Sequence, residues 1–188
     1  MINFRQYTNV EKIVIPNLVN ATSNFEYRFN NMRNLKYLYV DNNDITNACC
    51  LCRNCRNLVE KPVISNNITI MYEAYRNCYN LTGNPVCGDN VTSMYRSYSN
   101  CRNLTGNPVC GLNVIDMRGA YCNCINLTGT PACGNNVKYM SEAYYNCYKL
   151  TGLPVIGPNV TEMFLAYCNC YNLSAGTIYT KAKNITNA

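Results

Sequence analysis

The 14 cysteines are the residues of this chain best suited to chemistry. Their densest group is Cys49, Cys50, Cys52 and Cys55, and four thiolates can hold a structural zinc ion. Such sites usually combine two well-separated Cys-x-x-Cys pairs, whereas these four cysteines fall within seven residues. We therefore interpret the group as packing, and we expect no metal and no cofactor in this protein.

The composition excludes several kinds of catalysis. The chain has no histidine, so it cannot form a Ser-His-Asp triad, a Cys-His dyad or a histidine-ligated metal centre. Its 10 acidic residues show no spacing that pairs two carboxylates as the acid and base of glycoside cleavage. We therefore expect the protein not to be an enzyme.

The charge pattern bears on possible partners. The net charge is +6, from 16 basic and 10 acidic residues, and the basic residues are scattered along the chain. Nucleic-acid binding usually requires a basic stripe that neutralises several phosphates together. The sequence therefore predicts no nucleic-acid partner, and a protein or a glycan is expected instead.

No segment has the apolar character of a membrane span, which needs about 18 apolar residues or more. The first residues also lack the apolar run of a secretory signal peptide. We expect no membrane insertion and a location in the cytoplasm or in a virus particle. A cell-surface location is expected if the chain is a fragment or is exported by another route.

A 23-residue period determines where the notable residues lie. Methionine, leucine and cysteine all keep this step. The methionines are Met71, Met94, Met117, Met140 and Met163, and the leucines are Leu35, Leu58, Leu81, Leu104, Leu127, Leu150 and Leu173. One unit cannot bury its own apolar side, so the period predicts stacked coils that bury continuous columns.

Each unit reads as four short segments. In the unit that starts at Leu104, Gly-x-Pro-Val-Cys predicts a strand and the following Gly-x-Asn predicts a turn. The pattern Val-x-x-Met-x-x-x-Tyr has the spacing of a short helix, and Asn-Cys-x-Asn-Leu turns the chain back. Because proline cannot donate to a strand ladder, we expect the recurring prolines to face solvent.

The unit resembles the BspA-like (Treponema-type) leucine-rich repeat family, which also has a 23-residue period. Leu104 matches the leading leucine of that family, Val109 the strand isoleucine, Ala120-Tyr121 the Ala-Phe pair and Cys124 the cysteine, and the match covers about residues 30–180. Three polar residues depart from it at an apolar strand position: Asn84, Asn107 and Thr130. The resemblance implies a surface or adhesion protein, with no enzymatic activity and no particular ligand.

Period and resemblance together predict the fold class. We expect an α+β repeat solenoid, a leucine-rich-repeat-like right-handed coil with short strands, short helices and about seven coils. Residues 1–30 are expected to form an irregular N-terminal capping coil, residues 31–173 the tandem repeats, and residues 174–188 an incomplete C-terminal coil.

One cysteine column follows the period, and we interpret it as a structural core column, because cysteine packs as a small apolar residue. Disulfide clasps between coils are the alternative in an oxidising environment. The column consists of Cys55, Cys78, Cys101, Cys124, Cys147 and Cys170. A tyrosine column falls at the family's buried aromatic position, so the resemblance places it in the core: Tyr75, Tyr98, Tyr121, Tyr144 and Tyr167.

Two asparagine columns allow a structural and a functional interpretation. Their amides can bond the backbone and each other between coils, or an amide row can bind sugar hydroxyls. One column, at a turn, is Asn67, Asn90, Asn113, Asn136 and Asn159. The other, at the return bend, is Asn77, Asn100, Asn123, Asn146 and Asn169.

The predicted binding face combines small polar and aromatic residues. It consists of Thr82, Pro85, Thr105, Pro108, Thr128, Pro131, Thr151 and Pro154, with Tyr79, Tyr148 and Tyr171 beside them. A repetitive face with little charge suits a protein or a glycan, so we predict a non-enzymatic binding or adhesion module. The alternative is a structural component of an assembly such as a phage or virus particle, with self-assembly through the coil ends.

Overall fold

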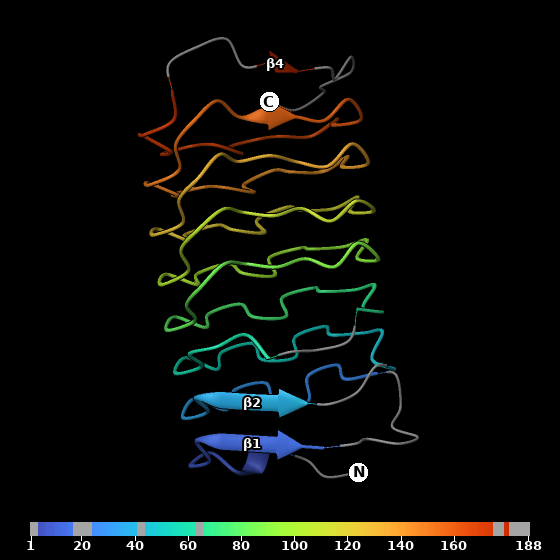
Figure 1. Ribbon diagram of the computed structural model, residues 1–188, viewed down its shortest axis with the longest axis vertical. Coiled ribbons are helices and arrows are strands. Elements are labelled where there is room, and N and C mark those ends of the chain that lie inside the picture. Colours follow the sequence, from blue (N-terminus) through green and yellow to red (C-terminus); the bar gives the residue numbers. More distant parts are fainter. Residues whose placement is uncertain (1–3, 17–23, 41–43, 63–65, 175–178, 181–188) are drawn as a thin grey trace.

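The chain forms a stack of similar coils that follow one another in sequence order from the N-terminal end to the C-terminal end (Figure 1). The computed structural model describes residues 4–16, 24–40, 44–62, 66–174 and 179–180. Single-residue parallel bridges join each coil to the next at one repeat position: Asn24 to Asn47, Asn47 to Ile70, Ile70 to Ser93, Ser93 to Asp116, Asp116 to Tyr139 and Tyr139 to Glu162. Residues one period apart in the sequence are therefore neighbours in space.

Regular secondary structure is short and lies at the two ends of the stack. The elements are the 3-10 helix η1 (Phe4–Gln6) and the strands β1 (Lys12–Ile15), β2 (Tyr37–Val40), β3 (Val155–Ile156) and β4 (Tyr179–Thr180). Strand β1 pairs in parallel with β2, and β3 pairs in parallel with β4. The β2 coil has Tyr39 where later coils have proline, so its backbone N–H remains available for pairing.

The short helices predicted at Val-x-x-Met-x-x-x-Tyr are not formed in the described part of the chain, where this segment is a series of tight turns. The N–H of Ser97 bonds the carbonyl of Met94 in its own coil, whereas the N–H groups of Arg96 and Tyr98 bond carbonyls of the next coil. Arg96 and Asn100 have positive φ, 50° and 64°. A left-handed residue interrupts an α-helix, so this prediction is wrong.

The prolines expected to face solvent are also placed differently. Pro85, Pro108, Pro131 and Pro154 are buried, whereas the valine that follows three of them is 42–54% exposed. Successive side chains of an extended segment point to opposite sides. The proline ring therefore packs inward, the next residue points outward, and the cysteine after it points inward again.

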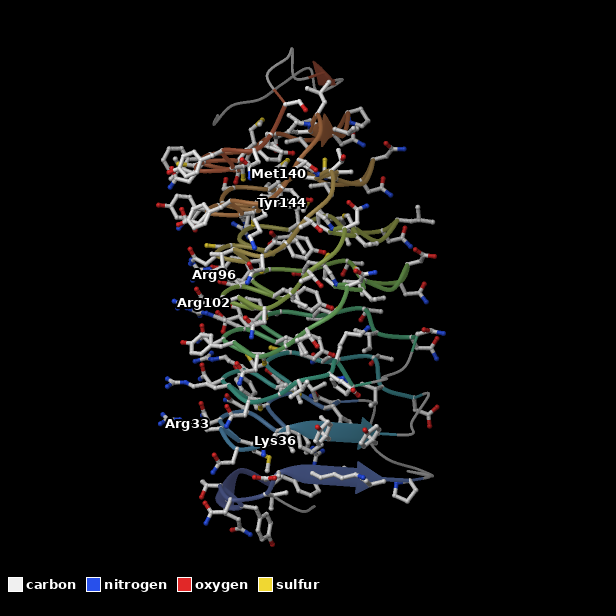
Figure 2. The ribbon with its side chains drawn as sticks, turned by 60° about the vertical axis from the view of Figure 1, so that its left-hand side comes forward. Arg33, Lys36, Arg96, Arg102, Met140 and Tyr144 are labelled. Carbon is white, nitrogen blue, oxygen red and sulfur yellow. The ribbon has the colours of Figure 1, made fainter. Side chains whose placement is uncertain are left out.

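The core consists of columns that run the length of the stack. Its largest members are Tyr75, Tyr98, Tyr121 and Tyr144, whose rings are fully buried and stack at 5.3–5.7 Å between centroids. Met140 and Tyr144 lie inside the ribbon in Figure 2. At the N-terminal end the ring of Phe4 packs against that of Phe29 at 5.2 Å and covers part of this core.

Candidate functional site

An asparagine ladder holds one corner of every coil. Each asparagine at the return bend, apart from the first, donates its Nδ2 to the Oδ1 of the asparagine one coil earlier, at 2.7–2.9 Å. Each also has φ between 59° and 67°, a left-handed conformation that asparagine tolerates better than most residues. The ladder consists of Asn31, Asn54, Asn77, Asn100, Asn123, Asn146 and Asn169. Bonding between asparagines of successive coils, the structural interpretation of this column, is confirmed.

The cysteine column lies beside the ladder and supplies hydrogen bonds. Each of its six thiols is buried and donates to the carbonyl oxygen of the residue 26 positions earlier, at 3.0–3.1 Å. All 14 cysteines lie in the described residues and are free. Burial raises the pKa of the Cys78, Cys101 and Cys147 thiols well above the usual value, which suppresses the reactive thiolate.

Alkaline pH is expected to destabilise the stack through its buried thiols, including those of Cys87 and Cys110, which lie outside this column. Burial raises the pKa of Cys87 to about 12 and that of Cys110 to about 11, from an ordinary value of 9.0. The unfolded chain therefore releases its thiol protons first, and stability should hold below pH 9 and fall as pH rises toward these values. Each such thiol contributes up to about 1.4 kcal/mol of loss per pH unit in that window. Urea unfolding at pH 8 and pH 10 measures the effect, and equal midpoints would contradict it.

The dense cysteine group does not converge on a common point. The Sγ atoms of Cys49 and Cys50 are 3.7 Å apart, and Cys50 lies near the carboxylate of Glu73, whereas Cys55 donates to the carbonyl of Phe29. Among the described residues, no group of three or more Cys, Asp or Glu side chains is arranged to hold a metal ion.

The residues of the predicted binding face belong to columns that differ in exposure. Thr82, Thr105, Thr128 and Thr151 are exposed, whereas the prolines of the face are buried. The three tyrosines belong to a different column: Tyr148 and Tyr171 are exposed and stack on each other at 5.8 Å, and Tyr79 is half-buried. The exposed part of the predicted face therefore consists of the threonines and of Tyr148 and Tyr171.

Four of the turn asparagines, the column for which the sequence left a sugar-binding amide row open, line an open groove of about 310 Å³. Each of them donates its Nδ2 to a carbonyl of the preceding coil at 2.9–3.2 Å, which fixes the amide plane. Three coils each add one further side chain to the lining, and these three side chains differ in polarity. The groove residues are Asn90, Asn113, Asn136, Asn159, Thr92, Ile115 and Lys138.

The groove offers polar groups that no protein atom uses. Among the described residues, no further hydrogen bond involves the Oδ1 of these four asparagines, so each amide presents an acceptor and a second N–H. Ile115 adds a 40% exposed apolar surface, and none of the ion pairs in the described residues uses Lys138. The groove therefore presents oriented amides with a single positive charge.

Comparisons with known proteins identify no relative: no protein-family model, curated protein or solved structure matches the chain. Within the described residues, no helix has the length and apolar character needed to cross a membrane.

Proposed function

We propose that the protein is a non-enzymatic binding module and that an extended, hydroxyl-rich glycan lies along the groove. The observation that carries this proposal is the row of four fixed amides, one per coil, from Asn90 to Asn159. An amide can donate to one sugar hydroxyl and accept from another, and its orientation here is set before the ligand binds.

Repetition supports a polymer over a single sugar. Successive coils repeat the same amide at about 4.8 Å, the usual spacing of paired strands. Each contact is weak alone, but contacts along one chain act together, because the first one raises the effective concentration for the rest. The resemblance of the unit to BspA-like repeats, whose members are commonly adhesion proteins, favours the same class of function.

The test uses a substitution that fills the groove with a larger side chain and keeps the hydrogen bonds that hold the asparagine amides. Ile115→Trp places a large ring beside the amide row, and Val14→Trp adds the same ring at a 57% exposed position on β1, outside the groove lining. Sedimentation with insoluble cellulose, chitin and xylan, together with a glycan array, measures binding. We expect Ile115→Trp to weaken retention about tenfold, which corresponds to about 1.4 kcal/mol, and Val14→Trp to leave it nearly unchanged.

Two results would contradict this proposal: retention of Ile115→Trp at the level of the unsubstituted protein, or no binding to any of these polysaccharides. Loss in both variants would also contradict it, because it would place binding outside the groove.

The alternative function, a structural component of an assembly, has one observation in its favour. Strand β1 pairs with β2 along one edge, and no described strand pairs with its other edge. The outward side chain of Val14 on β1 is 57% exposed. Unpaired edges of this kind template further pairing. Light scattering that gives a concentration-dependent mass would favour this alternative, and a constant monomer mass would count against it.

A further inference from the structure

Another column, next to the asparagine ladder, carries arginines that form no ion pair with the described residues. It consists of the residues that lie two positions after the asparagines of the ladder. We call it the Arg–Tyr column: Arg33, Arg56, Tyr79, Arg102, Ile125, Tyr148 and Tyr171. Arg33 and Arg102 lie along the same margin of the stack in Figure 2.

The centre of this column is an arginine–tyrosine–arginine sandwich. The guanidinium of Arg56 lies 5.5 Å from the centre of the Tyr79 ring, and that of Arg102 lies 5.3 Å from it. Arg56 comes from the coil before Tyr79 and Arg102 from the coil after it, so the two cover opposite faces. Cation–π contacts hold both guanidinium groups beside the ring, and both arginines remain exposed to solvent.

These arginines differ from Arg53, Arg76 and Arg118 in their charge balance. Arg53 and Arg76 pair with the buried carboxylate of Glu73, and Arg118 pairs with Asp116. No ion pair among the described residues involves Arg33, Arg56 or Arg102. Arg33 also borders a hollow of about 610 Å³ at the N-terminal end of the column, lined by Thr8, Asn9, Asn31, Arg33 and Asn34. The column thus presents repeated positive charge with a recess at its base.

We propose that the Arg–Tyr column binds an acidic polysaccharide, with its carboxylate or sulfate groups on the guanidinium edges of Arg33, Arg56 and Arg102. A guanidinium donates two parallel N–H bonds to such a group. The repeating anions of an extended glycan match arginines that recur along one axis. This site uses other residues than the amide groove, so the result of one binding test does not decide the other.

Single-stranded nucleic acid fits the column less well. Its binding proteins stack bases on open aromatic faces. Here both faces of Tyr79 are covered by guanidinium groups, and Tyr148 and Tyr171 cover a face of each other at an interplanar angle of 8°. The guanidinium edges suit anions that lie along the surface, without inserted rings.

The experiment compares two double variants that remove the same charge. Arg56→Gln/Arg102→Gln changes the column, and Lys12→Gln/Lys61→Gln removes two lysines that lie outside both the column and the amide groove, one exposed and one half-buried. Titration with heparin and with polygalacturonate at physiological salt measures affinity, and urea unfolding checks the fold of each variant. We expect the arginine variant to bind the better of the two probes about tenfold more weakly. The affinity of the lysine variant for the same probe should change by about twofold or less, as expected for charges outside the site.

Tyr79→Leu adds a readout that net charge cannot explain. It keeps both arginines but removes the ring that orients them, so we expect affinity to fall several-fold. Equal losses in the two double variants, unchanged binding by Tyr79→Leu, or no binding of either probe would overturn the proposal. Tighter binding of a thymidine oligonucleotide than of either glycan would overturn the assignment of the ligand.

Discussion

Replacing Tyr121 with alanine is expected to lower the free energy of unfolding by about 3–5 kcal/mol, as for other large aromatic residues removed from a core. The ring is fully buried and stacks between those of Tyr98 and Tyr144, at 5.7 and 5.5 Å. Its hydroxyl donates to the carbonyl of Val109 at 2.5 Å. The substitution therefore opens a cavity in a continuous column and leaves a carbonyl without its donor.

Urea unfolding followed by circular dichroism measures this effect. Tyr121→Phe removes the hydroxyl alone and is expected to cost about 1–2 kcal/mol. Leu112→Ala is the control, because the Leu112 side chain is 68% exposed and its removal should change stability by about 0.5 kcal/mol or less. Equal stability of Tyr121→Ala and Leu112→Ala would show that the tyrosine column is not the core.

The asparagine ladder is expected to be nearly as sensitive. Asn123 donates to Asn100 at 2.9 Å and accepts from Asn146 at 2.7 Å, and its φ is 62°. Asn123→Ala removes both hydrogen bonds and places a residue with a Cβ but no local polar compensation in a left-handed conformation. Together these losses should lower the free energy of unfolding by about 2–4 kcal/mol.

Two further variants separate the causes at this position. Asn123→Gly removes the same bonds but tolerates the positive φ, so it should lie between the wild-type protein and Asn123→Ala. Asn103→Ala, at an exposed position with no hydrogen bond in the described part of the chain, should change stability by about 0.5 kcal/mol or less. If Asn123→Ala behaves like Asn103→Ala, the ladder does not stabilise the fold.

Much of this architecture can be predicted from the period alone. A 23-residue recurrence of tyrosine, cysteine and asparagine forces each residue type into a column once the coils stack. Bonding between asparagines of successive coils at the return bend follows from that reasoning. The fold class itself remains a prediction.

Two local features could not be predicted from the sequence, because their spacing is ambiguous. Apolar residues three and four apart suit a helix, but they equally suit consecutive tight turns whose N–H groups bond the next coil. The residue that decides between them is the one with positive φ inside this segment, such as Glu73, Arg96 or Glu142. Only Gly119, at the same repeat position, is a residue type that indicates a left-handed conformation from the sequence. The inward proline was missed because a missing donor suggested solvent, whereas the apolar ring is buried where no ladder bond is required.

The candidate sites are formed by residues that are distant in the sequence and become neighbours only when the coils stack. Arg33, Arg56 and Arg102 are scattered in the sequence, yet they lie at one repeat position and form one column of the stack. The groove likewise depends on where the turn places four amides relative to Ile115 and Lys138. The absence of a nucleic-acid partner remains a prediction, and the oligonucleotide titration tests it.

Every column and both proposed sites require that residues one period apart touch. A double-mutant cycle between Asn100→Ala and Asn123→Ala, measured by urea unfolding, tests this contact directly. The two side chains share a hydrogen bond, so we expect a coupling energy of about 1 kcal/mol or more, while Asn77→Ala and Asn146→Ala, which share none, should be additive. Additive effects in the Asn100 and Asn123 pair would contradict the stack.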